Sequence, residues 1–484
     1  MKNIAPKLTH EEYERNFAEL HPPFTPNSAV AEANRCLYCY DSSCMKACPT
    51  HIDISTFIKK IATGNIKGSA KTILESNWIA LTCAKACPVD VLCEGACVYN
   101  ERKEPPIQIG RLQRYAMDWY FEHGMPPLFT PVAKNGKSVG IVGGGPAGLA
   151  CAAELALMGY DVTIYEAKVK PGGLDTWGIA PYKMKQQDSL NEVKLVESFG
   201  VKIKTGVKVG GDLPVDQLLK SHDAVFLGVG LGSPSKLNIP GEDLDGVIDA
   251  LDFIEKVTPR QWANVDVGRR VAVIGAGNTA IDAATEAKRL GAEQVMMIYR
   301  RSEKEMPAYE FEFELAKSDG IQFYFLTAPK RILGSKHVEG IECVKMKLGK
   351  PGTDGRKRPE EIPGSEFQIA VGMVIKSVGQ NIEQSFVVKI PDLKLHNGSI
   401  SVNPETMQTS NPKVFAGGDC ISGGQEVVNA AAEGKKAAWG IHRAMSNVEE
   451  CRMKNAEGSD EETRNKKRNF GGKMGRKNVS RKSV

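Results

Sequence analysis

The sequence has no long hydrophobic run and no export signal. None of its apolar stretches approaches the roughly 20 residues needed to cross a bilayer. The first seven residues lack the apolar stretch of a secretory signal peptide. These absences predict a soluble, cytoplasmic protein without a membrane partner, in a compartment that keeps thiols reduced.

Excess charge of either sign is scarce outside the C-terminal end. The formal net charge is +5, and residues 447–484 hold 11 Lys and Arg against 6 Asp and Glu, which accounts for all of it. The balanced charge of the preceding residues argues against nucleic-acid binding. We expect 447–484 to be a basic, disordered tail, because this stretch is rich in Lys, Arg, Asn, Gly and Ser.

Two further absences limit the chemistry. The cysteines at positions 151, 343, 420 and 451 form no Cys-x-x-Cys pair, which argues against a redox-active disulfide. The length of 484 residues leaves no room, beside the motifs described below, for an added (β/α)₈ barrel of roughly 250 residues.

The other eight of the 12 cysteines lie between residues 36 and 97, in two runs that each contain a Cys-Pro dipeptide. Thiolates are soft, anionic ligands that suit iron, and short spacings let one loop wrap a small cluster. Zinc, which usually takes two pairs of closely spaced ligands, is the alternative, whereas disulfide frameworks are typical of small secreted chains. The pattern favours two [4Fe–4S] clusters. Apolar residues at helical spacing in 54–61 and 69–74 predict a helical domain around them.

A glycine-rich turn follows a short apolar strand at 138–142 and precedes a helical pattern at 149–158. A second strand, at 160–166, then ends in an acidic residue. In such an order the glycines permit a tight turn, close approach of a pyrophosphate and close helix–strand packing, and the acid binds ribose hydroxyls. We therefore predict an FAD site that includes Gly143, Gly145, Pro146, Ala147, Gly148, Glu166 and Gly173.

A second copy of this pattern begins with a strand at 270–274. It predicts a nicotinamide-nucleotide site at Gly275, Gly277, Asn278 and Thr279. Its second strand ends in Arg300 and Arg301 instead of an acid. Guanidinium groups pair with a 2′-phosphate, which an acid would repel, so the pattern favours NADPH over NADH. The alternative is that both arginines are merely solvated at the strand end.

Near the C-terminal end, a strand at 413–416 leads to Gly418 and Asp419. The Asp419 carboxylate is suited to the ribityl chain of FAD, and a helix after residue 423 would point toward the ring system. The predicted fold is an α-helical [4Fe–4S] domain followed by two Rossmann-like α/β domains, the second inserted in the first. The expected ranges are 1–135 for the cluster domain, 136–245 with 378–446 for the FAD domain, 246–377 for the NAD(P)H domain and 447–484 for the tail.

Together, the cysteine runs, the paired glycine motifs and the Gly-Gly-Asp end resemble the module shared by the glutamate synthase small subunit and the N-terminal half of dihydropyrimidine dehydrogenase. The resemblance covers about residues 29–444. The stretches at 44–54, 81–88 and 106–116 lean toward the pyrimidine branch, in particular the flavin and iron–sulfur subunit of the bacterial two-subunit enzyme. The stretch at 299–307 instead resembles glutamate-synthase-type NADPH sites.

The resemblance implies that the cluster ligands cross over between the two runs. One cluster would be held by Cys36, Cys39, Cys44 and Cys97, and the other by Cys48, Cys87, Cys93 and Gln113. Cys83 would then not be a ligand. Glutamate synthase relatives tend to have a carboxylate at the position of Gln113, so the amide also favours the pyrimidine branch. Without the resemblance, Gln113 would be interpreted as a solvated helix residue.

The resemblance also implies an electron-input subunit in a hetero-oligomer. NAD(P)H would reduce FAD by hydride transfer, and electrons would leave singly through two clusters. The partner would be an FMN-containing catalytic subunit that interconverts uracil or thymine and their 5,6-dihydro forms. No general acid or base is needed for the hydride step, and none is assigned.

Three other functions compete with this one. They are the small subunit of NADPH-dependent glutamate synthase, a related ferredoxin–NADP oxidoreductase, and a scaffold protein that keeps a degenerate reductase fold. The intact glycines of both dinucleotide motifs argue against the scaffold.

Overall fold

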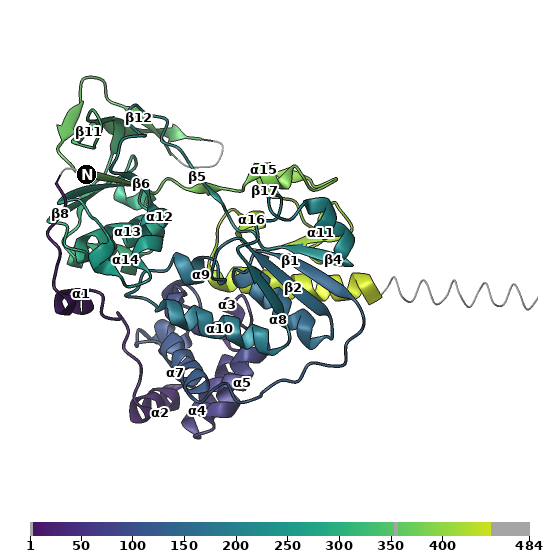
Figure 1. Cartoon of the computed structure of the whole chain (residues 1–484). Helices are drawn as coiled ribbons and strands as arrows, with labels where there is room; N and C mark the ends of the chain where they lie inside the picture. The colour runs from purple at the N-terminus through teal and green to yellow at the C-terminus, as the bar shows by residue number, and fades with distance from the viewer. Residues whose placement is uncertain (1–2, 353–356, 447–484) are drawn as a thin grey trace, which may run out of the picture.

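The computed structural model describes residues 3–352 and 357–446 (Figure 1), so the predicted basic tail, 447–484, lies outside the described residues. A helical unit is followed by two Rossmann-like α/β units, the second inserted in the first, which confirms the predicted fold class. In the described part of the chain, no helix is long and apolar enough to cross a membrane.

The helical unit surrounds the cysteine runs. Its helices are α2 (Pro26–Arg35), α3 (Ser43–Ala47), α4 (Ile54–Ala62), α5 (Ile66–Ser76), α6 (Ala80–Ala86) and α7 (Ile109–Glu122), with 3₁₀ turns η1 (Val89–Val91) and η2 (Val98–Arg102). α4 begins where Asp53 Oδ1 accepts a hydrogen bond from Thr56 N at 3.1 Å. One face of α4 buries Ile54, Phe57 and Ile58, so the helical spacing in the sequence reflects a real amphipathic helix.

Five parallel strands form the sheet of the first α/β unit, here called the FAD unit. In spatial order they are β18 (Val414–Ala416), β4 (Ala224–Leu227), β1 (Ser138–Val142), β2 (Asp161–Glu166) and β3 (Lys202–Thr205). Its helices include α8 (Pro146–Leu157), α10 (Gln186–Ser198), α11 (Val215–Ser221) and a helix over 427–446. β18 follows the inserted unit in sequence but pairs with β4, so this unit is discontinuous.

The inserted unit, here called the NADP(H) unit, has its own five-stranded parallel sheet. The strand order is β6 (Val247–Asp249), β14 (Met373–Lys376), β7 (Arg270–Ile274), β8 (Gln294–Ile298) and β9 (Gln322–Tyr324). Its helices are α12 (Ala250–Val257), η3 (Trp262–Asn264), α13 (Asn278–Arg289), η4 (Glu303–Glu305) and α14 (Glu310–Ser318). Four antiparallel strands extend it, namely β10 (Thr327–Leu333), β11 (Gly340–Pro351), β12 (Lys357–Glu361) and β13 (Phe367–Ile369).

The two chain connections between the FAD and NADP(H) units run side by side. They pair as the antiparallel strands β5 (Ser233–Pro234) and β15 (Gln380–Asn381). The returning chain then forms α15 (Gln384–Val387), β16 (Leu395–His396) and β17 (Ser399–Ile400) before β18.

The N-terminal segment lies apart from the helical unit in which the 1–135 boundary placed it. Ala5 N donates a hydrogen bond to Val267 O at 2.8 Å, and α1 (His10–Asn16) packs on the NADP(H) unit. The Phe17 ring stacks on Trp262, with centroids 4.5 Å apart. Aromatic stacking and strand-like pairing with distant residues leave no local sequence signal, which explains the difference.

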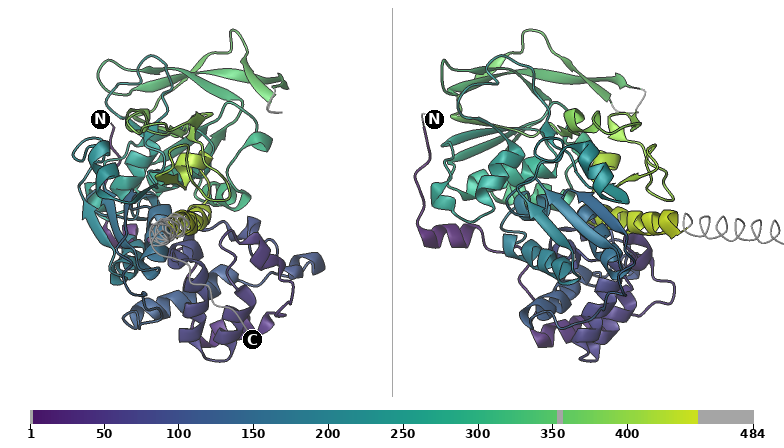
Figure 2. Two further views of the ribbon diagram at one scale, coloured as in Figure 1. Left: turned by 90° about the vertical axis from the view of Figure 1, so that its right-hand side faces the viewer. Right: turned by 45° about the vertical axis from the view of Figure 1, so that its right-hand side comes forward.

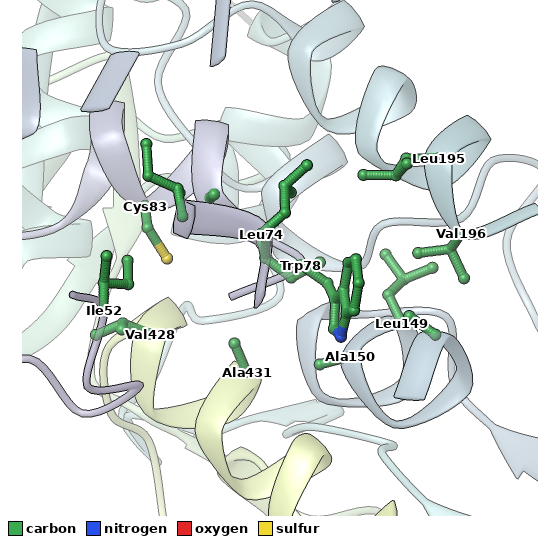
Figure 3. Packing of buried hydrophobic residues seen from close by; sticks show 14 of the residues in the cluster. Ile52, Leu74, Trp78, Cys83, Leu149, Ala150, Leu195, Val196, Val428 and Ala431 are labelled. Atoms are coloured by element: carbon green, nitrogen blue, oxygen red, sulfur yellow. The ribbon is translucent and has the colours of Figure 1, made fainter. Parts of the chain in front are cut away.

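The helical unit and the FAD unit share one hydrophobic core. Trp78, which follows α5, lies beside Leu149 and Ala150 of α8 (Figure 3). Its indole Nε1 donates to Glu154 Oε2 at 2.9 Å. Figure 2 shows the helix over 427–446 lying between the helical unit and the FAD sheet. This shared core fixes the distance between the cysteine runs and the FAD unit.

Candidate functional site

The first cavity of the helical unit is lined by cysteines of both runs, Cys36, Cys39, Cys44 and Cys97. The isoleucines at 54, 58, 107 and 109 also line the cavity and make its wall largely apolar. Burial, together with charge on the neighbouring cysteines, raises the pKa of Cys44 to about 11. Metal binding at this cavity must therefore release protons, because thiolates and not thiols are the ligands.

The second cavity is lined by Cys48, Cys83, Cys87, Cys93 and Gln113. Cys44 lies near the start of α3 and Cys48 directly follows its end, so these two cysteines of one run line different cavities. The structure thus brings together the two sets of residues implied by the resemblance and adds Cys83 to the wall of the second.

Gln113 and Cys83 each form a hydrogen bond at the wall of the second cavity. Gln113 Nε2 donates to Ala80 O at 2.7 Å, and within the described residues its Oε1 accepts no hydrogen bond. Cys83 Sγ accepts a hydrogen bond from Asn77 Nδ2 at 3.1 Å. The Gln113 amide oxygen is suited to a metal. The hydrogen bond to Cys83 does not exclude that thiol as a ligand, because Cys48, a predicted ligand, also forms one, with Thr50 Oγ1 at 3.3 Å.

The cysteines are spread around their cavities and do not converge on a point. Among residues 3–352 and 357–446, no three His, Cys, Asp or Glu side chains come close enough to hold a single metal ion. A zinc ion requires its thiolates at about 2.3 Å from one centre. Thiols at the periphery of a cavity instead match the corners of a multi-iron cluster. The geometry therefore favours iron–sulfur chemistry over zinc.

A long cleft lies at the carboxyl ends of β1, β4 and β18, where open α/β sheets bind their ligands. Most residues of the predicted FAD site line it: Gly143, Gly145, Pro146, Ala147, Glu166, Gly173, Gly418 and Asp419. Gly148 does not. It packs inside α8 against the Gly143 carbonyl, which a Cβ at this position would overlap.

The first glycine turn is built for close approach of a phosphate. Gly143 has φ +97°, and a Cβ there would overlap the Gly228 carbonyl, so only glycine fits. Gly145 is the N-cap of α8, so the unsatisfied N–H groups of that helix start at the cleft. Glu166 accepts hydrogen bonds from Gly144 N and Lys168 N, both at 2.8 Å. Its carboxylate thus also braces the turn against the end of β2.

Asp419 begins the short α16 (Asp419–Ser422) directly after β18. Its Oδ1 accepts a hydrogen bond from Gln425 N at 3.0 Å, and burial raises the pKa of this carboxyl. Gly418 N donates to Glu433 Oε2 at 2.6 Å, which ties the turn to the helix over 427–446. This helix starts a few residues after the predicted position of 423.

The second glycine turn has the same architecture. Gly275 has φ +138°, and a Cβ there would overlap the Ser377 carbonyl. Gly277 is the N-cap of α13, and it, Asn278 and Thr279 are half-buried. The Asn278 side chain accepts a hydrogen bond from Tyr309 N at 3.0 Å, so the loop before α14 lies over this turn.

Arg300 and Arg301 follow β8 after one residue, Tyr299. Neither forms an ion pair within the described residues, and Arg300 is exposed. Arg301 Nε is buried and has no hydrogen-bond partner there. A buried guanidinium nitrogen without a partner costs free energy unless an anion binds it, so this position fits a phosphate group better than a solvated surface.

The three cavities adjoin one another through neighbouring residues. Val428 lines the second cysteine cavity, and Ala430, two residues later in the same helix, lines the FAD cleft. Figure 3 shows Val428 beside Ile52 and Cys83. Ile109 lines the first cysteine cavity and Gly110 the second. Because a helix rises about 1.5 Å per residue, each cavity lies within a short distance of the next.

Two family models match the chain. Residues 13–125 match the model described as dihydropyrimidine dehydrogenase domain II, 4Fe-4S cluster. Residues 137–434 match the model of the pyridine nucleotide-disulphide oxidoreductases. The chain belongs to the pyridine nucleotide-disulphide oxidoreductase family. Within this family, the chain combines a 4Fe–4S domain with an FAD- and NADPH-dependent oxidoreductase. This combination is that of a glutamate synthase small-subunit-like module, which is an electron-transfer oxidoreductase.

Relatives among known proteins agree with this family. The glutamate synthase [NADPH] small chains of Halomonas elongata and Escherichia coli are each 35% identical, with 88% of this chain and 93% of theirs covered. The NADP(+)-dependent formate dehydrogenase subunit beta of Moorella thermoacetica is 36% identical over 83% of this chain and 60% of its own. FprA of Mycobacterium tuberculosis in complex with NADPH shares the fold, at a TM-score of 0.54 and 22% identity over 65% of this chain and 86% of its own.

These relatives favour the glutamate synthase alternative over the pyrimidine branch that the sequence motifs suggested. The pyrimidine assignment depended on short stretches near the cysteines. The family model that matches 13–125 covers a domain that, according to the resemblance, both branches contain. Short ligand-bearing stretches are constrained by the cluster and not by the final substrate, so they discriminate poorly between branches.

The residues that connect the sites were not predicted from the sequence. Val428 and Ala430 lie in the helix predicted after residue 423, and Gly110 lies in the stretch at 106–116, but none of the three was predicted to line a cavity. Leu174 and Trp177 of α9 (Leu174–Trp177) also line the FAD cleft. Their only sequence signal is their position directly after Gly173.

Replacement of Arg301 by alanine is expected to raise KM for NADPH by about tenfold or more, because a charge-assisted hydrogen bond contributes about 1.5–3 kcal/mol. KM for NADH should change little, since NADH lacks the 2′-phosphate. Steady-state reduction of an artificial dye by each nucleotide measures both constants, and Arg300→Ala is expected to act in the same direction. Equal effects on both nucleotides would remove the assignment.

Proposed function

We propose that this protein is the electron-input subunit of a hetero-oligomeric reductase of the glutamate synthase type. The observation that carries the proposal is the adjoining series of FAD cleft, second cysteine cavity and first cysteine cavity. Cofactors bound in these three sites would therefore lie next to one another in this order. Such a series suits a protein that takes electrons in at one end and delivers them at the other.

FAD supplies a two-electron acceptor for hydride, and iron–sulfur clusters supply one-electron carriers. The task of the chain is to hold them. Gly143 and Gly145 admit one pyrophosphate, Gly275 and Gly277 admit the other, and the arginines after β8 bind the 2′-phosphate. No side chain is assigned a proton-transfer role in hydride transfer.

We further propose two [4Fe–4S] clusters with crossed ligands. One is held by Cys36, Cys39, Cys44 and Cys97, and the other by Cys48, Cys87, Cys93 and Gln113. The shared cavities support these sets. Cys83 also lines the second cavity, and it is left out on the resemblance alone. The first cavity adjoins the second, and from the first cavity electrons pass to the partner subunit.

A second candidate is the flavin subunit of a dihydropyrimidine dehydrogenase, with an FMN-containing partner. Gln113 favours it, because the glutamate synthase branch tends to have a carboxylate at this position. Both candidates place the final substrate in the partner and not in this chain.

The ligand sets are tested by two substitutions at the second cavity. Gln113→Ala should lose the electron paramagnetic resonance signal of one cluster, because it removes a ligand oxygen. Cys83→Ala is the matched control at the same wall and should keep both signals. The reverse pattern would overturn the assignment of these two residues.

The division of labour is tested with the protein alone and with its partner. The isolated chain should reduce an artificial dye with NADPH and leave both uracil and glutamine with 2-oxoglutarate unchanged. After co-purification with its partner, turnover of glutamine with 2-oxoglutarate is expected. Turnover of uracil by the complex would favour the second candidate, and turnover of either substrate by the lone chain would contradict both.

A further inference from the structure

One segment of the FAD unit, residues 173–184, connects the FAD cleft to the core of the NADP(H) unit. Gly173, Leu174 and Trp177 line the cleft. A few residues later, Ala180 and Tyr182 are fully buried in the hydrophobic core of the NADP(H) unit. The contacts of this short segment therefore determine how the NADP(H) unit sits relative to the cleft.

Lys183 of this segment forms a buried ionic contact with two helices of the NADP(H) unit. Its Nζ lies 2.8 Å from Asp282 Oδ1 on α13 and 2.5 Å from Glu312 Oε1 on α14. The Tyr182 hydroxyl donates to the same Asp282 oxygen at 2.6 Å. The lysine side chain is 14% exposed, so water screens these contacts weakly.

A third carboxyl group lies on the same helix. Glu286, one turn after Asp282, is fully buried, and both its oxygens lack a hydrogen-bond partner within the described residues. Burial, reinforced by the charge of Asp282, raises the pKa of Glu286 well above its ordinary value. Lys183 contacts the carboxyl groups of Asp282 and Glu312, whereas among the described residues it has no hydrogen bond to Glu286.

A second polar contact joins the two units near the NADP(H) glycine turn. The Tyr309 hydroxyl donates to Glu426 Oε1 at 2.6 Å, directly before the helix over 427–446. Tyr309 N donates to the side chain of Asn278 at the start of α13. The same residue thus contacts the NADP(H) turn and the helix that lines the FAD cleft.

Buried ion pairs contribute little net stability, because desolvation offsets their attraction, but breaking one partner is costly and their geometry is directional. α13 is the helix whose N-terminus forms the NADP(H) turn. An ionic contact to the side of this helix therefore sets the orientation of a nucleotide that is bound at the helix N-terminus.

We propose that Lys183 and Tyr309 are positioning residues that hold α13 in a fixed orientation to the FAD cleft, so that bound nicotinamide reaches the flavin ring. The inference rests on the proposed function, because it concerns hydride transfer between these two sites. Neither residue touches the reacting atoms. Each acts through α13, Lys183 from its side and Tyr309 from its start.

The experiment uses the full-length protein with its cofactors and two independent variants. Lys183→Met alone would leave two buried carboxylates without a cation, so it is combined with Asp282→Asn and Glu312→Gln, which removes all three charges. Tyr309→Phe removes only the hydroxyl and keeps the ring beside Phe311. The control is Lys317→Met, which removes an exposed cation that pairs with Glu314 on the same α14.

The triple variant is expected to lower kcat for NADPH-dependent dye reduction by about 100-fold, since a misplacement of about 1 Å has an effect of that size. Tyr309→Phe should lower kcat in the same direction by a smaller factor. The Kd for NADP⁺, measured by calorimetry, should stay the same in both, because the glycine turn and Arg301 are untouched. The long-wavelength absorbance of stacked nicotinamide and flavin should weaken. The control should match the wild type in all three readouts.

Folded variants with wild-type kcat would overturn the proposal. A loss of NADP⁺ affinity as large as the loss of kcat would also overturn it, because it would show damage within the NADP(H) unit and not misorientation. Wild-type protein that fails to reduce the dye with NADPH would instead contradict the proposed function. The two failures are therefore distinguishable.

Discussion

The packing of the helix over 427–446 across two cavities is the constraint on which the rest of the structure depends. Its first turns line the second cysteine cavity through Val428 and the FAD cleft through Ala430. The helix can approach α8 closely because residue 434 is glycine, where a Cβ would overlap the Ala147 carbonyl. A larger residue there would push the helix away from the FAD cleft. The helical unit and the FAD unit share one core around this contact, so their cavities are held together as a rigid pair.

The NADP(H) unit is attached by different means. Its core is separate, and apart from the paired strands β5 and β15 it is joined to the FAD unit mainly by the segment over 173–184 and by polar contacts. The difference between the shared apolar core and the polar attachment matches the difference between electron transfer and hydride transfer. Electrons tunnel between fixed carriers, whereas hydride transfer requires a nucleotide that binds and leaves, at a defined angle to the flavin. A rigid apolar interface suits the first and a directional polar interface suits the second.

Local sequence patterns predicted the fold class, both glycine turns and most residues of the FAD cleft, because strand, turn and helix signals act over a few residues. The sorting of the cysteines into two cavities came from a resemblance and not from spacing, since the turn of α3 that separates Cys44 from Cys48 is too short to show in the sequence. Contacts between distant segments had no local signal: the N-terminal segment on Trp262, Val428 beside Cys83, and Lys183 between α13 and α14. The leaning toward the pyrimidine branch depended on short ligand-bearing stretches, and the relatives do not support it.

On the proposed electron path, the first cysteine cavity is reached only through the second. This path is tested most directly by reducing a Cys87→Ala variant, in which the second cluster cannot form, and recording the spectrum of the first cluster by electron paramagnetic resonance. Dithionite, a small reductant that reaches any exposed cluster, is expected still to reduce the first cluster, whereas NADPH should not do so on the time scale of wild-type turnover. Reduction of the first cluster by NADPH at the wild-type rate would contradict it.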